Sequence, residues 1–239
     1  IAEMADYVVV MYAGRVVEKG TAQEIFANPA HPYTIGLMAS KPIVGKKVDR
    51  LYSIPGKVPN PVNMPNYCYF KDRCEMALPC CDGEYPCEIS LSPTHKVSCY
   101  RYYENKLDYT PVTYDDQYIL MVNQLKKYFP IKGGLMSQTV GHVKAVDGVT
   151  FNLKRGHTMG LVGESGCGKS TTGRTILRLA GEKTGGQVLF NGKEVYDMTG
   201  RELRNLRTKM QIIFQDPFSS LSPRLPVGEI IGEAVREHN

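Results

Sequence analysis

A glycine-rich segment at residues 163–170 constrains the fold of this chain more than any other feature. It reads Gly-Glu-Ser-Gly-Cys-Gly-Lys-Ser and fits the pattern G-x-x-x-x-G-K-[ST]. An apolar stretch at residues 158–162 precedes it, and a helical pattern at residues 171–179 follows it. Glycines permit the backbone angles that turn successive N–H groups inward around an anion, and a helix adds its positive N-terminal end. The segment therefore predicts a phosphate-binding loop between a strand and a helix.

The side chains of this loop suit a nucleotide polyphosphate. Lys169 is expected to neutralise the β- and γ-phosphates, and the Ser170 hydroxyl is expected to ligate Mg²⁺. Cys167 occupies a freely variable position of the motif, and its thiol is assigned no chemistry. The nucleotide-binding residues expected here are Gly163, Glu164, Ser165, Gly166, Cys167, Gly168, Lys169, Ser170 and Thr171.

Patterns elsewhere in the chain predict short strands and helices. Residues 7–12 and 16–18 predict two strands joined by a turn, and Thr21 with Glu24 predicts a capped helix that runs to residue 26. Seven prolines within residues 28–66 exclude long helices there. Strands are expected at residues 118–122, at 143–153 with a break at Asp147-Gly148, and at 210–214, where the strand is expected to be buried. A hairpin is expected at residues 186–195 across Asn191-Gly192, and a basic helix at residues 201–209.

The charge of the chain is unevenly distributed. Residues 1–110 carry 12 Lys and Arg and 12 Asp and Glu, whereas residues 111–239 carry 17 and 12, so the net charge of +5 lies in the second part. This excess is compatible with a phosphate-bearing ligand, but it is too small and too scattered to indicate a nucleic-acid partner. The longest apolar run, near residues 8–13, is far shorter than the roughly 18 residues of a membrane span.

Two longer strings resemble the ATP-binding subunits of ABC transporters, and among these the oligopeptide/dipeptide importer group. The first, residues 162–172, contains the phosphate loop, and the second, residues 210–224, reads Met-Gln-Ile-Ile-Phe-Gln-Asp-Pro-Phe-Ser-Ser-Leu-Ser-Pro-Arg. Gln215 matches the Q-loop glutamine, which in that family reaches Mg²⁺ and the attacking water. The resemblance therefore implies catalytic roles for Lys169 and Gln215. Residues 125–130 match the aromatic loop of the family, which implies that Phe129, or else Tyr128, stacks on adenine.

The same resemblance divides the chain. Residues 2–26 resemble the segment that follows the switch histidine in peptide-importer subunits, and residues 28–34 resemble the start of their C-terminal extension. This implies the end of a first ATP-binding domain at residues 1–27, the extension with its cysteines at 28–100, a linker at 101–117 and the N-terminal part of a second ATP-binding domain at 118–239. The implied fold class is α/β, a partial P-loop NTPase (ABC ATPase) domain preceded by a small irregular cysteine-rich lobe. The sequence after Ser170 contains no signature motif, no strand ending in Asp-Glu and no switch histidine, so we expect no ATP turnover by this stretch alone.

Six of the seven cysteines lie between Cys68 and Cys99. The spacing Cys68-x5-Cys74-x6-Cys81-x17-Cys99 contains no C-x2-C pair, so it is not that of a zinc ribbon, and it is not a bacterial ferredoxin spacing. A phosphate loop without a secretory leader indicates a reducing compartment, which disfavours disulfides. Zinc held by four of the thiols, with His95 as a further candidate, a [4Fe–4S] cluster and unliganded thiols all remain open on spacing alone.

The resemblance narrows these alternatives. Residues 68–81 and 93–100 resemble the C-terminal cysteine motif of peptide-importer ATPases, in which four cysteines hold an iron–sulfur cluster. The resemblance implies that the ligands of a [4Fe–4S] cluster are Cys68, Cys74, Cys81 and Cys99. Cys80 is an alternative third ligand, and Cys87 is an extra thiol. His31 precedes a proline in a predicted turn, and it is expected to be a turn residue and not a metal ligand.

The resemblance implies a fused, tandem ATP-binding subunit that energises the import of peptides, nickel or related small solutes. Its cofactors would be ATP, Mg²⁺ and the iron–sulfur cluster. Its partners would be the permease membrane subunits, a second ATP-binding domain and, indirectly, an extracellular substrate-binding protein, with no nucleic acid. It would lie peripherally on the cytoplasmic face of the cell membrane. The alternative is a non-catalytic metal-binding and docking segment with an incomplete nucleotide site; a P-loop kinase is weaker, because it accounts for neither the 186–195 hairpin nor the string around Gln215.

Overall fold

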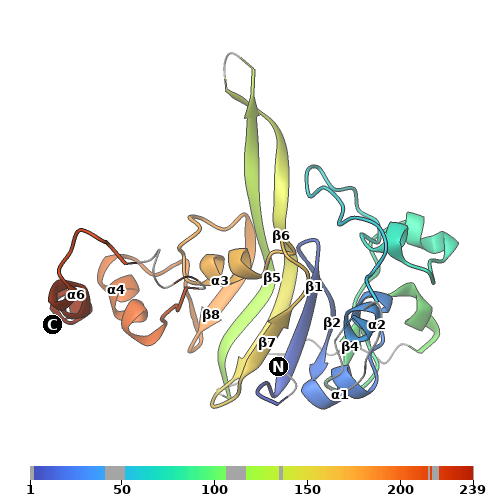
Figure 1. Ribbon diagram of the computed structural model, residues 1–239, viewed down its shortest axis with the longest axis horizontal. Coiled ribbons are helices and arrows are strands. Elements are labelled where there is room, and N and C mark those ends of the chain that lie inside the picture. The colour runs from blue at the N-terminus through green and yellow to red at the C-terminus, as the bar shows by residue number, and fades with distance from the viewer. Residues whose placement is uncertain are drawn as a thin grey trace. The chain divides into compact units, whose positions relative to one another are not determined.

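The computed structural model describes residues 3–40, 52–105, 117–134, 137–214, 216 and 221–238 (Figure 1). The chain forms two compact units, Ile1–Val195 and Tyr196–Asn239, which we call unit 1 and unit 2. The elements of unit 1 are β1 (Tyr7–Tyr12), β2 (Arg15–Thr21), α1 (Ala22–Ala27), α2 (Pro32–Ala39), η1 (Lys71–Arg73), η2 (Pro79–Asp82), β3 (Ile89–Ser90), β4 (Lys96–Val97), η3 (Tyr100–Asn105), β5 (Tyr118–Gly133), β6 (Gln138–Lys154), β7 (Met159–Val162), α3 (Lys169–Ile176), β8 (Gly185–Phe190) and β9 (Lys193–Glu194). Unit 2 contains α4 (Gly200–Lys209) and α6 (Val227–His238). The phosphate loop and all seven cysteines lie in unit 1.

The N-terminal hairpin forms as the sequence predicts. β1 and β2 pair antiparallel, and α1 begins directly after β2. The backbone N–H of Glu24 donates to the Thr21 hydroxyl at 3.2 Å, and the Thr21 N–H donates to the Glu24 carboxylate at 2.9 Å. These two bonds form a capping box, which satisfies N–H groups that have no partner within the helix. The predicted strands and the predicted helix start are confirmed.

The hairpin also holds the strand that leads to the phosphate loop. Unit 1 contains a five-stranded sheet in the order β3-β4-β2-β1-β7, and β7 pairs with β1 in parallel. Tyr7 lies opposite Met159, and Val10 lies opposite Val162. The apolar run at residues 8–11 is fully buried, as expected of a strand covered on both faces. Two segments far apart in the sequence therefore form one sheet under the phosphate loop.

The second sheet of unit 1 has the order β6-β5-β8-β9. β5 and β6 form a long antiparallel ribbon (Figure 1), which extends well beyond the strands predicted at residues 118–122 and 143–153. β6 continues through the break predicted at Asp147-Gly148, but its pairing with β5 is irregular at that point. Leu125 pairs with Val149 and Lys126 with Asp147, so Gly148 forms a bulge with φ of +77°. The predicted turn across residues 191–192 is confirmed between β8 and β9, with φ of +48° and +77° at its two residues.

The region that contains the cysteines is irregular, but it is not separate from the hairpin. We call residues 67–100 the cysteine segment. Its short strands β3 and β4 extend the five-stranded sheet at β2, and Tyr69 and Phe70 share a core cluster with β1 residues such as Val8 and Tyr12. The expectation of a cysteine-rich lobe of its own is therefore not confirmed. The expected linker at residues 101–117 begins with η3, and residues 106–116 lie outside the described part of the chain.

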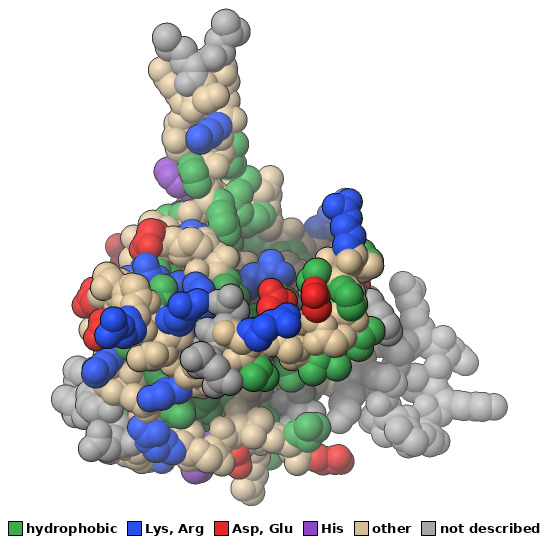
Figure 2. Space-filling view, turned by 90° about the vertical axis from the view of Figure 1, so that its left-hand side faces the viewer, with side chains coloured by type: hydrophobic (Ala, Val, Ile, Leu, Met, Phe, Trp, Pro, Cys, Tyr) green, Lys and Arg blue, Asp and Glu red, His purple; other side chains and the backbone are tan. Residues whose placement is uncertain are grey.

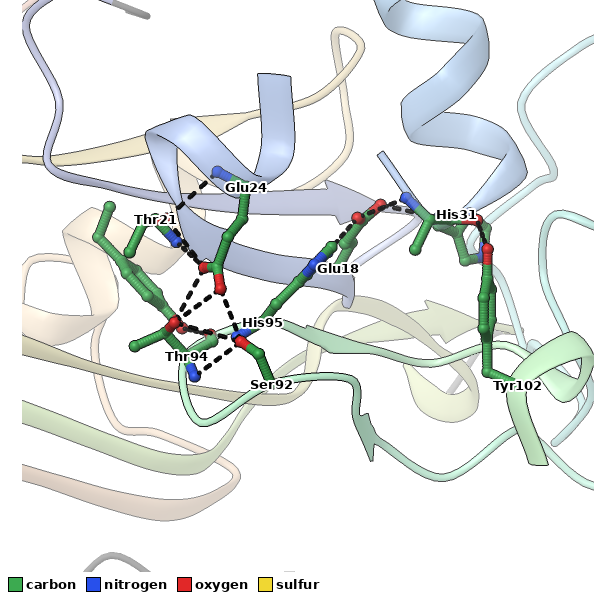
Figure 3. A network of polar contacts seen from close by, with 10 residues as sticks. Glu18, Thr21, Glu24, His31, Ser92, Thr94, His95 and Tyr102 are labelled. Carbon is green, nitrogen blue, oxygen red and sulfur yellow. Dashed lines mark hydrogen bonds and ion pairs between the residues drawn. The ribbon is translucent and has the colours of Figure 1, made fainter. Parts of the chain in front are cut away.

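A polar network joins the cysteine segment to β2 and α1 (Figure 3). The buried Glu18 carboxylate accepts hydrogen bonds from the backbone N–H groups of Ala30 (2.7 Å) and His31 (2.8 Å), and it pairs with His95 Nε2 at 2.7 Å. The Glu24 carboxylate accepts from the hydroxyls of Ser92 (2.6 Å) and Thr94 (2.8 Å). A buried carboxylate with three partners is satisfied where it lies, so the network fixes the cysteine segment against the hairpin.

Unit 2 is more exposed than unit 1. The helix predicted at residues 201–209 is confirmed as α4, but the buried strand predicted at 210–214 is wrong. These residues have no regular structure, and Ile213 is 95% exposed. An apolar run becomes a strand only where it finds a partner strand, and the described residues of unit 2 contain none. The face that Figure 2 shows carries several Lys and Arg side chains, which are interspersed with hydrophobic side chains. No helix among the described residues has the length and apolar character that crossing a membrane requires.

Candidate functional site

The phosphate loop lies where the sequence predicts it. β7 ends at Val162, the loop follows, and α3 begins at Lys169. Gly163, Gly166 and Gly168 all have positive φ, of +150°, +80° and +102°. Gly168 is also the residue that caps α3, so the amino end of this helix opens onto the loop. The predicted strand–loop–helix arrangement is therefore present, with α3 ending at Ile176, three residues earlier than predicted.

The loop is packed tightly against two strands. A Cβ atom added to Gly163 would lie 2.2 Å from the Met11 carbonyl oxygen of β1, and one added to Gly168 would lie 2.3 Å from the Ala145 carbonyl oxygen of β6. The Gly14 N–H donates to the Cys167 carbonyl at 3.0 Å. Close backbone approach on two sides explains why the loop requires glycine at both positions. The N-terminal hairpin and β6 thus fix the shape of the loop.

Lys169 lies across this loop. Its ammonium donates to the carbonyl oxygens of Gly163 and Glu164, both at 2.9 Å, and lies 3.4 Å from the Cys167 sulfur. Cys167 itself is buried, while Ser170 is exposed on the first turn of α3. The ammonium is therefore centred among the loop residues, where a bound polyphosphate would compete for it. Because Ser170 is exposed, its hydroxyl could serve as a ligand of a metal ion.

Arg73 and Tyr33 contact the same loop, and neither was predicted. The Arg73 guanidinium pairs with the Glu164 carboxylate through two bonds, Nη1–Oε2 at 2.7 Å and Nη2–Oε1 at 3.1 Å. The Glu164 backbone N–H donates to the Tyr33 hydroxyl oxygen at 2.8 Å. The hydrogen bond to Glu164 raises the pKa of Arg73 above its usual value, so this group stays charged. Arg73 and Glu164 lie far apart in the sequence, and no spacing rule links them.

A second ion pair lies beneath the loop. Arg15 donates through Nε to the Asp147 carboxylate at 2.8 Å, and the hydroxyl of Tyr69 donates to the same oxygen at 3.2 Å. Tyr128 donates to the other Asp147 oxygen. Burial acts to raise the pKa of Asp147, but the Tyr128 hydrogen bond and the charge of Arg15 hold it below its usual value. The pair joins the β1–β2 turn to the bulge of β6, so it supports the packing of the loop.

The aromatic residue expected at adenine is exposed. Phe129 lies on β5, is 39% exposed, and pairs across the ribbon with Val143. Val143 is two residues from Ala145, whose carbonyl abuts the phosphate loop. The Tyr128 hydroxyl is committed to Asp147, whereas the Phe129 ring is partly exposed and has the Lys127 ammonium 5.0 Å from its centre. Gln215, the other residue implied by resemblance, lies outside the described residues.

The structure sorts the cysteines into two groups. Cys68 and Cys74 are half-buried, and Cys81 and Cys99 are buried, whereas Cys80 and Cys87 are exposed. Burial and the neighbouring thiols of Cys81, Cys99 and Cys74 raise the pKa of Cys68 to about 12. Burial and the Cys74 and Cys81 thiols likewise raise the pKa of Cys99. The four thiols therefore lie near one another, although no group of three or more His, Cys, Asp or Glu among the described residues is arranged to hold a metal ion directly.

Cys87, His95 and His31 have partners other than the four thiols. The Cys87 thiol lies 3.2 Å from the Tyr103 hydroxyl, and its backbone N–H donates to that hydroxyl. His95, a further candidate ligand, is paired with Glu18 and not with the cysteines. His31 caps α2, because its Nδ1 accepts the Tyr33 N–H at 3.0 Å. This cap is consistent with the prediction that His31 is a turn residue.

Known protein families match two parts of the chain. The oligopeptide/dipeptide transporter C-terminal region matches residues 17–81, and the ABC transporter family matches residues 146–238. The chain is 36% identical over 250 residues to the oligopeptide transport ATP-binding protein OppD of Mycobacterium bovis, covering 99% of this chain and 41% of OppD. Two separate parts of the chain are therefore similar to ABC transporter ATP-binding proteins of the oligopeptide/dipeptide group.

This chain is similar to another relative to the same degree. It is 36% identical over 238 residues to the glutathione import ATP-binding protein GsiA of Escherichia coli K12, which covers all of this chain and 32% of GsiA. The chain therefore spans less than half the length of these relatives. Among solved structures, cbiO1 from Clostridium perfringens, part of the ABC transporter complex cbiONQ, aligns at 25% identity over 50% of this chain and 49% of that one. Its TM-score of 0.33 is too low to support an argument.

Proposed function

We propose that the protein to which this chain belongs binds and hydrolyses ATP to energise the import of peptides or related small solutes. The observation that carries the proposal is the phosphate loop between β7 and α3, with Lys169 centred over it and Ser170 exposed at the helix start. Backbone N–H groups at a helix N-terminus together with a lysine form a strong polyphosphate site. The relatives whose alignments cover nearly all of this chain are an oligopeptide transport ATP-binding protein and a glutathione import ATP-binding protein, which supports the transport role.

The test is whether ATP binding depends on Lys169. Replacing Lys169 with Ala removes the only loop side chain of positive charge, so the affinity of the full 239-residue chain for Mg-ATP should fall about tenfold or more, the equivalent of one charged hydrogen bond. Lys193→Ala, on the exposed β9, is a matched control that should bind as the wild type does. Calorimetry measures both. Equal affinities for the wild type and Lys169→Ala would refute the nucleotide site.

Two further residues complete the proposed nucleotide site. Phe129 would stack on adenine, and its exposed ring on β5 supports this role. Gln215 would act with Lys169 in catalysis, reaching Mg²⁺ and the attacking water as its position in the matched family region implies. Mg²⁺ would be held by Ser170 and the nucleotide phosphates, because an oxygen donor set is what this ion prefers.

We also propose that Cys68, Cys74, Cys81 and Cys99 hold a [4Fe–4S] cluster. The electrostatic interaction of these four thiols with one another supports the proposal, because cysteine thiolates are the ligands of such clusters. Burial favours Cys81 over the exposed Cys80 as the third ligand. When bound, the cluster would order the cysteine segment, whose described residues form only short strands and 3₁₀ turns.

Anaerobic purification tests the cluster. The protein should be brown and contain about four irons and four sulfides per chain. Cys99→Ser should bleach it, whereas Cys87→Ser is a matched control that should not, because Cys87 is exposed and bonded to Tyr103. Bleaching by Cys80→Ser but not by Cys81→Ser would reverse the assignment of the third ligand. A colourless protein with one zinc per chain would refute the cluster.

The proposed partners are permease membrane subunits, a second ATP-binding domain and, indirectly, a substrate-binding protein, at the cytoplasmic face of the membrane. The α6 helix of unit 2 supports a docking role, because Val227, Ile231 and Val235 recur on one helix face and are 71%, 70% and 59% exposed. The proposed division of the chain is a first-domain end at residues 1–27, an extension at 28–100, a linker at 101–117 and a second-domain start at 118–239. The match of residues 17–81 to the C-terminal region family supports the extension.

A further inference from the structure

The cysteine segment reaches into the phosphate loop through one side chain. Arg73 is the last residue of η1 and directly precedes Cys74. Its side chain is 5% exposed, and apart from Glu164 it donates to three other oxygens. Nε donates to the Pro55 carbonyl at 2.8 Å, Nη2 to the Ile54 carbonyl at 3.2 Å, and Nη1 to the Tyr12 hydroxyl at 3.3 Å. A guanidinium held at this many points has a fixed position, so it fixes the carboxylate that it binds.

The turn that carries Arg73 is itself anchored to the hairpin. Phe70, directly before η1, packs against Tyr12 with ring centres 5.2 Å apart and against Tyr33 at 5.4 Å. Tyr33 in turn accepts the hydrogen bond of the Glu164 N–H. Glu164 is therefore held by its side chain and by its backbone, in both cases by residues that precede residue 100. The cysteine segment therefore acts on the phosphate loop both through the packing of Phe70 on Tyr33 and through the hydrogen bonds to Glu164.

The charge of Glu164 explains why such a contact matters. Glu164 follows the first glycine of a loop whose other features attract anions, and its carboxylate is 28% exposed. An unpaired carboxylate at this position would repel a polyphosphate, because like charges disfavour each other at short range in a partly desolvated site. Two hydrogen bonds from Arg73 neutralise this charge, while the Lys169 ammonium bonds the backbone carbonyl of Glu164.

We propose that Arg73 is a positioning residue of the phosphate loop, so that polyphosphate affinity depends on the cysteine segment. Arg73 holds Glu164 in place and cancels its charge, and it does not itself contact the phosphates. The inference rests on the proposed function, because it presupposes that the loop binds phosphate. It differs from that proposal in locating a determinant of affinity outside the nucleotide motif.

The test uses Mg-tripolyphosphate, which occupies a phosphate loop without contacting an adenine site. Binding to the full chain is measured by calorimetry for the wild type, Arg73→Gln and Lys71→Ala. Lys71 lies on the same 3₁₀ turn and pairs with Asp82 at the surface, so it is a matched control for damage to the turn. We expect Arg73→Gln to bind about fivefold or more weakly and Lys71→Ala to bind as the wild type does. Equal affinity of Arg73→Gln and the wild type would overturn the inference.

A second substitution distinguishes a positioning role of Arg73 from a general folding defect. Adding Glu164→Gln to Arg73→Gln removes the unpaired carboxylate, so the double variant should recover at least half of the lost binding free energy. A fold defect caused by losing Arg73 would not be repaired by this change, so absence of rescue would also overturn the inference. If Arg73→Gln does not fold, Arg73→Lys keeps the charge but lacks the two-bond geometry, and the same rescue is read in that background.

The outcome for the wild type keeps the two proposals apart. A wild-type chain that binds tripolyphosphate in a Lys169-dependent way, with Arg73→Gln unaffected, would refute the role of Arg73 and leave the nucleotide site standing. A wild-type chain that does not bind at all would refute the nucleotide site, and the role of Arg73 with it.

Discussion

Replacing Gly168 with Ala should destabilise unit 1 through a backbone overlap that no side chain can relieve. Gly168 has φ of +102°, and its added Cβ would lie 2.3 Å from the Ala145 carbonyl oxygen. The left-handed conformation costs an L-residue roughly 1–2 kcal/mol, and a forced overlap in a packed site costs a further 1–3 kcal/mol. We therefore expect the free energy of unfolding to fall by about 2–5 kcal/mol.

Gly166→Ala is the matched control for this substitution. Gly166 has φ of +80°, but an added Cβ would meet no atom within 4 Å. It should cost only the conformational part, roughly 1–2 kcal/mol. The chain has no Trp, and every tyrosine except Tyr196 lies in unit 1, so tyrosine fluorescence during urea unfolding reports on unit 1. Equal losses for Gly166→Ala and Gly168→Ala would show that close approach to β6 does not set the shape of the loop.

Three other predictions concern pH, a helix start and nucleotide selectivity. Burial lowers the pKa of His31 to about 4, while the charge of Glu18 acts to raise it. The unfolded chain therefore takes up the proton first as the pH falls, and the free energy of unfolding should drop by about 2 kcal/mol between pH 7 and pH 5. Urea unfolding of His31→Gln should lack this pH-dependent loss, and a variant with the same pH dependence as the wild type would contradict the prediction. Thr21→Ala should cost about 1 kcal/mol of stability in the same assay, because it opens the capping box with Glu24, and no measurable loss would show that the cap is dispensable. Phe129→Ala should weaken Mg-ATP about fivefold or more but leave Mg-tripolyphosphate unchanged, because stacking acts on the base alone, and equal weakening of both ligands would argue for a structural role.

The pairing between β1 and β7 shows a limit of sequence reasoning. Both strands were predicted from their apolar runs, but each run is compatible with any partner strand of similar pattern. Packing between segments far apart in the chain determines that β1 pairs with β7. Val162 of β7 packs against the core cluster that contains Val8 and Val10 of β1. The same limit explains the error at residues 210–214, because this apolar run predicts a strand but finds no partner strand among the described residues of unit 2.

Features that depend on a few neighbouring residues can be predicted from the amino-acid sequence. The phosphate loop, the Thr21–Glu24 capping box and the turn at residues 191–192 are local, because their glycines and short polar side chains set backbone angles and hydrogen bonds within one turn. Contacts between residues far apart in the sequence become visible only in the folded chain. The fold brings Arg73 to Glu164, and it leaves Cys80 and Cys87 exposed while the thiols of the four proposed cluster ligands are buried or half-buried. Such contacts leave no periodic trace in the sequence, because they follow from how whole strands and turns pack against one another.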